Sequence, residues 1–500
     1  MTRSVSTNVR PAFEEGHAEH IRGNLDLACR YYARTLVLDP MHAAAMHFMG
    51  VVLDQISANP MAEKYFSRAI STNRDQAIFY SNYGAVLLRH GRFLDALENF
   101  EAAVRIDPAS ADDYRAAGDA MRGLEQHVEA RIAYGKTLTL APDDYRGYQN
   151  FGSLAESVGS FQLARYRFER ALQLAPRSQA ADLSVNLSLV LLILGDFRRG
   201  WELYEARRSA PSWQHLLPPV DFQSRALLPR HGDSDAILLQ AEQGLGDEVM
   251  FGSLIREFMG AYPVKVIRID RRLVDLFSRA FPGVEVISRE TPVDGSQITS
   301  CVYFGSLGQL LRSTEAAFKP DRGAYLSADI ECVKKIKETL HKSQRLLIGL
   351  SWFSTSNKYS YVPLMEILTA LGDLDVEFVN LQYGDVREAI DTVVRDTGKK
   401  IHMIDSVDNF SDIDGLSALI SACDLVLTVG NATAHLSGAL GQRTWVMLPT
   451  NPTWRWQAAG AESLWYPQMR LFRQSSSTLW GDVLSIVRND LIELLRDESP

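Results

Sequence analysis

The segment Ala77–Pro108, AIFYSNYGAVLLRHGRFLDALENFEAAVRIDP, is one copy of a motif that recurs along the first half of the chain. Glycine holds the same place in five copies, each 34 residues apart, at Gly16, Gly50, Gly84, Gly118 and Gly152. Alanine keeps this period from Ala28 to Ala164, and a proline closes several copies. A 34-residue period with two small residues and a closing proline is typical of tetratricopeptide repeats.

Each copy predicts two helices. In the quoted copy they cover Ala77–His90 and Phe93–Ile106, Gly91 separates them, and Pro108 ends the pair. No copy can bury its apolar face alone, so neighbouring copies must stack into a superhelix with a concave surface. We therefore expect an α-superhelical solenoid of about six repeats over residues 1–211.

The concave surface of a solenoid suits a protein or peptide partner. Polar residues on the first helices could hold an extended peptide backbone, and they are Asn82, Asp119, Asn150 and Asn186. Asn186 also falls on the glycine place of the series, so it could belong to the core. The alternative to partner binding is a rigid spacer or a dimerisation arm.

Composition limits the class of protein. The chain has 500 residues, too many for one core, and its net charge of −9 weakly disfavours a general nucleic-acid binder. No two of its four cysteines suggest a metal knuckle or a redox pair. No leader-like apolar segment follows the N-terminus, and no stretch approaches the length of a membrane span. We expect a cytoplasmic protein without membrane insertion.

The periodicity changes after a proline-containing linker, residues 212–235. Short apolar strands are then predicted at Ala236–Gln240, Val264–Ile269, Val284–Ile287, Cys301–Phe304, Leu346–Leu350, Glu377–Leu381, Leu425–Val429 and Thr444–Leu448. Helices fall between many of them, including one over Glu248–Tyr262. This alternation predicts two parallel α/β halves, residues 236–325 and 326–500, with ligands beyond the carboxyl ends of the strands.

Three segments at those strand ends have unusual polar content. In Ala241–Phe251, Gly244 and Gly246 allow a tight turn, and Asp247 follows as a helix cap or as a general base. In Leu425–Pro449, a helix begins after Asn431, and its first turn, with Thr433 and His435, could bind a phosphate.

The third segment, Pro449–Gln474, is rich in Trp and Arg. These side chains could stack a base or a sugar, although a packed C-terminal wrap over the sheet explains them slightly better.

Five ordered motifs together resemble a known enzyme family. They are EQGLGD (242–247), GLSW (349–352), NLQYGD (380–385), AHLSGALG (434–441) and WYPQMRLFRQ (465–474). The chain resembles tetratricopeptide-linked glycosyltransferases of the heptosyltransferase-like superfamily, which have the GT-B architecture of two Rossmann-like domains. The resemblance covers roughly Ala236–Arg488, and such fusions occur among bacterial protein glycosyltransferases that include those modifying flagellin.

The resemblance implies roles for individual residues. Asp247 matches the proposed catalytic base. The residues implied to face the nucleotide-sugar donor are Gly244, Gly246, Trp352, Lys358, Gln382, Tyr383, Asn431, Thr433 and His435. One position departs from the pattern: relatives usually have Asp-Thr before the last of these helices, where this chain has Gly430-Asn431. That departure suggests a different donor or a reduced activity.

The Asp-x-Asp pairs, Asp373/Asp375 and Asp412/Asp414, fit caps or turns better than a magnesium site, and we expect no metal or other cofactor.

From the repeats and the resemblance together, we expect a glycosyltransferase that moves a sugar from a nucleotide-sugar donor to Ser or Thr of a protein, with flagellin as a possible acceptor. The rivals are a transferase for a lipid or polysaccharide acceptor and a non-enzymatic repeat scaffold with a degenerate second half.

Overall fold

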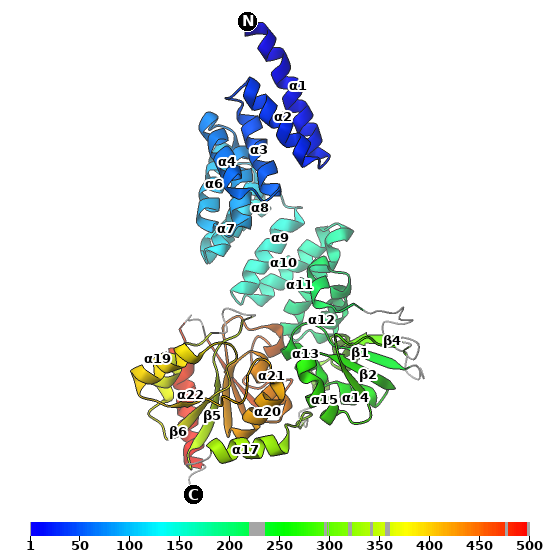
Figure 1. The fold of residues 1–500 in the computed structure, drawn as a ribbon, viewed down its shortest axis with the longest axis vertical. Coiled ribbons are helices and arrows are strands. Elements are labelled where there is room, and N and C mark those ends of the chain that lie inside the picture. Colours follow the sequence, from blue (N-terminus) through cyan, green and yellow to red (C-terminus); the bar gives the residue numbers. More distant parts are fainter. Residues whose placement is uncertain are drawn as a thin grey trace. The chain divides into compact units, whose positions relative to one another are not determined.

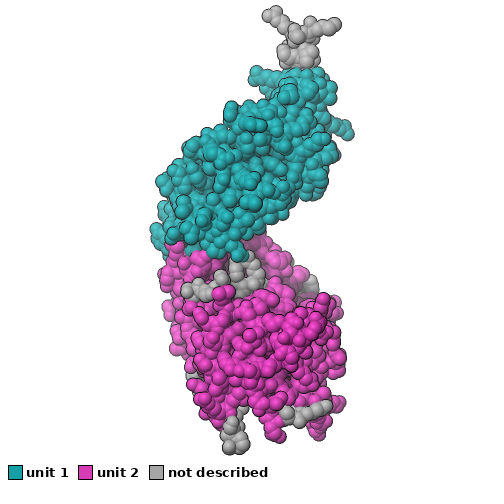
Figure 2. Space-filling model, turned by 90° about the vertical axis from the view of Figure 1, so that its left-hand side faces the viewer, with its two compact units in different colours: residues 1–155, 166–175 teal, residues 156–165, 176–500 magenta. Residues whose placement is uncertain are grey.

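The computed structural model describes residues 2–219, 236–294, 298, 300–318, 323–340, 344–355, 361–475 and 479–497, with side chains from residue 9 onward. Contacts divide the chain into two compact units (Figure 2). The first contains residues 1–155 and 166–175, and the second contains residues 156–165 and 176–500.

The repeats form consecutive pairs of antiparallel helices (Figure 1). The pairs are α1 (Thr2–Ile21) with α2 (Leu25–Leu38), α3 (Ala43–Gln55) with α4 (Asn59–Thr72), α5 (Ala77–Arg89) with α6 (Phe93–Ile106), α7 (Ala111–Gly123) with α8 (His127–Leu140), α9 (Tyr145–Ser157) with α10 (Phe161–Leu174), and α11 (Ala180–Ile193) with α12 (Phe197–Tyr204). The predicted tetratricopeptide-like solenoid is confirmed.

The periodic glycines exist because an aromatic ring covers each one. The rings belong to Tyr32, Phe66, Phe100, Tyr134 and Phe168, always 16 residues after the glycine, and all five are buried. A Cβ added to Gly118 would lie 2.6 Å from the ring of Tyr134, closer than any packed Cβ can lie. The two helices of each of the first five pairs therefore approach through a glycine–aromatic contact, which fixes their spacing.

Three of the four predicted groove residues, Asn82, Asp119 and Asn150, instead connect neighbouring repeats. The side-chain nitrogen Nδ2 of Asn82 lies 2.9 Å from Nε2 of His47. The side-chain nitrogen Nδ2 of Asn150 donates to Oδ1 of Asp119 at 2.8 Å. Asp119 also accepts a bond from Tyr134 at 2.6 Å. These side chains form hydrogen bonds within the solenoid. They therefore stabilise the packing of neighbouring repeats, and a bound peptide would have to compete for them.

The last helical pair belongs to the second compact unit. Arg207, just after α12, donates from Nη2 to Oε1 of Glu242 at 2.8 Å, and both side chains are fully buried. Glu242 also accepts a bond from the Gly305 amide at 2.7 Å. The helical repeats end close to the predicted boundary at residue 211. The last helical pair, α11 with α12, nevertheless belongs to the same compact unit as the first sheet.

The second unit contains two fully parallel sheets. Within the described residues the first has the order β3-β2-β1-β4 and the second the order β10-β9-β8-β5-β6-β7. The strands are β1 (Ile237–Gln240), β2 (Val264–Ile269), β3 (Glu285–Ser288), β4 (Ser300–Tyr303), β5 (Leu346–Ser351), β6 (Val376–Asn380), β7 (Ile401–His402), β8 (Leu425–Val429), β9 (Thr444–Leu448) and β10 (Met469–Arg473).

Helices connect the strands of both sheets, as parallel pairing requires (Figure 1). Those between strands of one sheet are α13 (Leu245–Gly252), α14 (Ile255–Met259), α15 (Val274–Ala280), α18 (Leu364–Leu371), α19 (Arg387–Thr397), α20 (Ile413–Ala422) and α21 (Ala432–Ala439). Helices α16 (Ser306–Leu311) and α17 (Ile330–Leu340) lie between β4 and β5, and α22 (Gly481–Asp497) follows β10. The core of the second sheet includes the buried Leu350, Phe378 and Leu427 together with Val487 of α22. The second half therefore has the predicted α/β class.

Three elements differ from the sequence-based prediction. The helix predicted over Glu248–Tyr262 is two helices, α13 and α14, which break near Ser253. Strands β7 and β10 were not predicted. The linker prediction falls partly on residues 220–235, outside the described residues, while residues 211–216 form a 3-10 turn, η3. In the part of the chain that the structure describes, no helix combines the length and apolar character needed to cross a bilayer.

The glycine–aromatic contact leads to a stability prediction. Gly118→Ala forces a methyl group against the ring of Tyr134 and should destabilise the repeat unit by about 1–3 kcal/mol, the usual cost of overpacking. Gly135→Ala is the matched control, because a Cβ there meets nothing within 4 Å and gains up to about 1 kcal/mol of helix propensity. Thermal melts followed by circular dichroism compare the two variants, and equal melting temperatures would contradict the packing argument.

Candidate functional site

A cavity of about 550 Å³ lies in the second unit, where the carboxyl ends of the two sheets face each other. The residues after β1, around α13, form one wall, and those after β8, around α21, form the other. Trp213 and Leu216 of η3 also line it, so part of the predicted linker contributes to the site. Ligand sites of open parallel sheets lie at this end of the strands.

The two walls approach closely because Gly246 has no side chain. A Cβ at this position would lie 3.1 Å from Cδ2 of His435 and 3.5 Å from Cα of Ala432. The first turns of α13 and α21 therefore meet at one end of the cavity. Helix N-termini carry partial positive charge and free amide groups, so this end of the cavity suits an anion.

Asp247 lies in the first turn of α13 and lines the cavity. It does not cap the helix, because the N-cap is Gly244. Its Oδ1 accepts a bond from Nε of Arg455 at 2.6 Å, and Nη2 of Arg455 contacts the same oxygen. Arg455 also lines the cavity. Arg455 belongs to the segment rich in Trp and Arg, 449–474, and nothing in the sequence of that segment points to Asp247 as its partner.

Asn431 serves the cavity indirectly. Its Oδ1 caps α21 by accepting from the Ala434 amide at 3.2 Å, and its Nδ2 donates to Oγ of Ser351 at 2.8 Å and to the carbonyl oxygen of Phe353 at 3.0 Å. The whole side chain amide is thus engaged inside the protein. It fixes the start of α21 against the end of β5 and leaves ligand contacts to its neighbours.

Thr433 is the strongest candidate for a ligand contact. Its side chain is 1% exposed and lines the cavity, and its Oγ1 has no hydrogen-bond partner within the described part of the chain. Thr453, which also lines the cavity, has a hydroxyl without a partner among the described residues as well. Buried hydroxyl groups are normally paired, so both oxygens indicate a polar ligand or water at this place.

His435 is held as a neutral ring. Burial, and to a smaller extent the positive charge of Arg455, lower the pKa of His435 to about 3. The ring stacks on Trp456 at 4.9 Å, and Nδ1 lies 3.3 Å from the Tyr466 hydroxyl. The neutral imidazole can offer a ligand one N–H group but no charge, so cationic attraction must come from arginine.

Packing against Trp456 explains why a glycine stands at position 430, where the resemblance leads one to expect an aspartate. A Cβ at this position would lie 2.6 Å from Nε1 of Trp456, whose side chain is 1% exposed. The indole therefore occupies the space into which a side chain at position 430 would extend. Nε1 of Trp456 has no partner among the described residues. Where the family that this sequence resembles usually has an aspartate side chain, this protein has the indole N–H group of Trp456.

Two predicted donor-binding residues do not line this cavity. The Trp352 side chain is 3% exposed and belongs to the core of the second sheet. Gln382 is also buried, and its Oε1 accepts bonds from the Ser351 hydroxyl and from the amides of Trp352 and Phe353 at 2.8–3.0 Å. Gln382 therefore holds the end of β5 in place. Tyr383, next to it, does line the cavity and accepts a bond from the Thr355 amide at 3.1 Å.

The cavity unites seven of the ten predicted site residues. They are Gly244, Gly246, Asp247, Tyr383, Asn431, Thr433 and His435. Lys358 lies outside the described residues. Arg272, which our sequence analysis missed, adds a second cation, held by Asp270 through two bonds of 2.9 Å. Among the described residues, no group of three or more His, Cys, Asp or Glu side chains could hold a metal ion.

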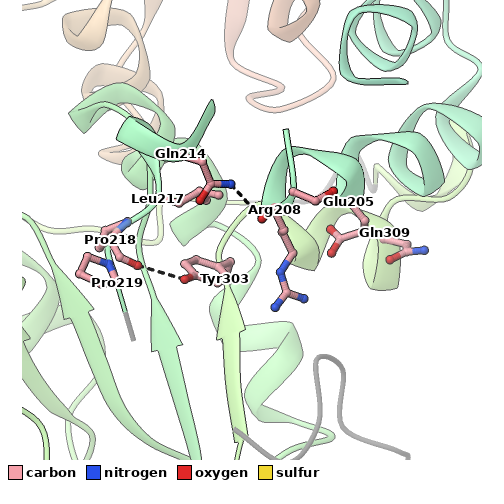
Figure 3. A pocket seen from close by; sticks show the side chains of 9 residues that line it. Glu205, Arg208, Gln214, Leu217, Pro218, Pro219, Tyr303 and Gln309 are labelled. Carbon is pink, nitrogen blue, oxygen red and sulfur yellow. Dashed lines mark hydrogen bonds between the residues drawn. The ribbon is translucent and has the colours of Figure 1, made fainter. Parts of the chain in front are cut away.

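A larger cavity of about 780 Å³ lies elsewhere in the second unit (Figure 3). Its lining includes Arg208, whose guanidinium lies 5.5 Å from the ring centre of Tyr303, and Pro218, whose carbonyl oxygen accepts a bond from the Tyr303 hydroxyl at 3.0 Å. It shares no lining residue with the cavity at α13 and α21. We favour the smaller cavity as the functional site, because its polar groups converge at strand and helix ends.

Comparisons with known proteins agree with the solenoid. No family model matches the chain. Over 500 residues it is 28% identical to Protein FlbA of Caulobacter vibrioides, covering 94% of this chain and 82% of that protein. Over 98 residues it is 28% identical to human tetratricopeptide repeat protein 7B, covering 20% of this chain and 12% of that protein.

Two solved structures match the repeats. The crystal structure of MamA has 23% identity and a TM-score of 0.31, with 33% of this chain and 90% of that chain covered. PilF of Pseudomonas aeruginosa has 19% identity and a TM-score of 0.34, with 42% and 90% covered. From its helical pairs and its sequence relatives, the chain is a tetratricopeptide-like repeat protein similar to FlbA, joined to a half with two parallel sheets.

Proposed function

We propose that this protein is a glycosyltransferase of GT-B architecture that transfers a sugar from a nucleotide-sugar donor to a protein hydroxyl. One observation carries the proposal: a carboxylate, Asp247, lines the same cavity as a helix N-terminus, the arginine Arg455 and the Thr433 hydroxyl, which has no hydrogen-bond partner among the described residues. A transferase of this kind needs a base for the acceptor and an anion site for the leaving nucleotide.

The proposed reaction assigns one task to each side of the cavity. The acceptor Ser or Thr oxygen forms a bond to the anomeric carbon of the sugar while its proton passes to Asp247. The bond between that carbon and the donor phosphate oxygen breaks, and the nucleotide leaves as an anion. The first turn of α21, the Thr433 hydroxyl and the arginines stabilise the charge that develops on the phosphate.

The repeats would supply the acceptor. Tetratricopeptide-like repeats generally bind proteins, and the solenoid here offers several helical pairs for this purpose. A protein acceptor therefore suits this chain better than a lipid or a polysaccharide, and the resemblance suggests flagellin as the first acceptor to try.

The first prediction from this proposal concerns Asp247. In the full-length protein, Asp247→Asn should slow sugar transfer by about 100-fold or more, because general-base catalysis typically contributes 10²–10⁴-fold. The donor comes from a thermal-shift screen of CMP-, UDP-, GDP- and ADP-linked sugars, since a ligand that binds the folded state raises its melting temperature. Mass spectrometry of the acceptor measures transfer. Unchanged turnover in Asp247→Asn would remove the assignment of the base.

The second prediction separates ligand contacts from structural contacts with two polar-to-apolar changes. Thr433→Val removes a hydroxyl that has no partner in the described part of the protein, so it should weaken nucleotide binding by about 5–10-fold and leave the melting temperature unchanged or higher. Gln382→Met removes an acceptor shared by three donors, so it should lower stability by about 2–5 kcal/mol.

Calorimetric titration with the nucleotide found in the screen, alongside thermal melts, tests both variants. If Thr433→Val bound the nucleotide as tightly as the unmodified protein, the phosphate site would not lie at α21.

A further inference from the structure

The ion pair between Arg455 and Asp247 joins α13 to the segment that follows β9, and both residues line the cavity. Nε of Arg455 lies 2.6 Å from Oδ1 of Asp247, and the side chains are only 19% and 13% exposed. At this degree of burial, water and salt screen the attraction weakly. Both nitrogens of Arg455 contact Oδ1 of Asp247. The other oxygen, Oδ2, lies near Gly244, 3.8 Å from the position of a Cβ added to that residue. In this state the guanidinium occupies one oxygen of the carboxylate that the proposed reaction uses as its base.

The backbone that carries Arg455 is firmly held. Arg455 belongs to the short 3-10 helix η7 (Trp454–Trp456), whose two Trp side chains are buried. The Ala458 amide that follows donates to the carbonyl oxygen of Ile193 at 3.0 Å. The guanidinium lies 4.8 Å from the ring centre of Trp454. A change of partner by Arg455 therefore requires rotation of its side chain alone.

A bound anion would compete with Asp247 for this cation. Arg455 and Thr433 line the same cavity, and the charge of Arg455 already acts on the buried ring of His435 in the first turn of α21. A diphosphate at that turn carries more negative charge than one carboxylate, and it offers the planar guanidinium two oxygens.

We propose that Arg455 is a positioning residue that couples donor binding to release of the base: it pairs with Asp247 in the empty site and moves to the donor phosphate when the donor binds. Asp247 then has both oxygens available for the acceptor hydroxyl. Departure of the nucleotide restores the ion pair, so the donor must bind before the base is ready. This inference rests on the proposed function and adds an order of events to it.

A double-mutant cycle on the full-length protein tests the coupling, with inorganic pyrophosphate as the probe and calorimetry as the measurement. Asp247→Asn should strengthen pyrophosphate binding by about 10-fold, within the usual range of coupling between sites, because Arg455 no longer has to leave a carboxylate. In the presence of Arg455→Gln, the same change should strengthen binding by less than about 2-fold. Arg455→Lys keeps the charge and should retain part of the coupling.

Arg272→Gln is the matched control. Arg272 lines the same cavity but is paired with Asp270, so a cycle of Arg272→Gln with Asp247→Asn should be additive. Equal effects of Asp247→Asn with and without Arg455 would overturn the coupling and leave the proposed function intact. Absence of pyrophosphate binding in every folded variant would overturn both.

Discussion

The close approach of α13 and α21 is the constraint on which the site depends. Gly246 permits it, because any side chain there would meet His435 and Ala432. The contact brings the positive ends of two helices from different sheets to one cavity, and Gly244, which caps α13, has no side chain to neutralise that charge. Asp247, the carboxylate of the first turn of α13 that lines the described part of the cavity, is compensated by Arg455 from a third segment. An anion can therefore be bound where the two sheets meet, with Arg272 and Arg455 as the arginines of the described cavity lining.

Much of the fold could be predicted because periodicity records burial. Strands β2, β8 and β9 match the predicted ranges residue for residue. Strands β8 and β9 are buried and almost wholly apolar, as strands inside a parallel sheet usually are, and β2 keeps four apolar residues around Lys265 and Arg268. Edge strand β10 was missed because Arg470 and Arg473 interrupt its apolar pattern, and β7 has only two residues. The glycine period predicted the solenoid, but the reason for the glycines needed the aromatic partner from the second helix of each pair.

The site was harder to predict than the fold, because its contacts join distant segments. Arg455 lies 208 residues from its partner Asp247, and no spacing rule links them. Gln382 and Trp352 are close in sequence to residues that line the cavity. Both side chains are nevertheless buried, and Gln382 accepts a bond from the Trp352 amide, so they stabilise the end of β5. The motif around Gly430 indicated a lost acidic group. Only the structure shows that the Trp456 indole fills that space, so the change reflects a different lining.

The buried pair of Arg207 and Glu242 bears on how such a protein can be assembled in evolution. Each of these fully buried charges is compensated mainly by the other, and loss of one partner from such a pair costs about 3–5 kcal/mol. The last repeat is therefore inherited with the sheets. Shuffling of repeat arrays between proteins should join sequences upstream of α11, where the first compact unit ends, and the number of earlier repeats is free to vary between lineages.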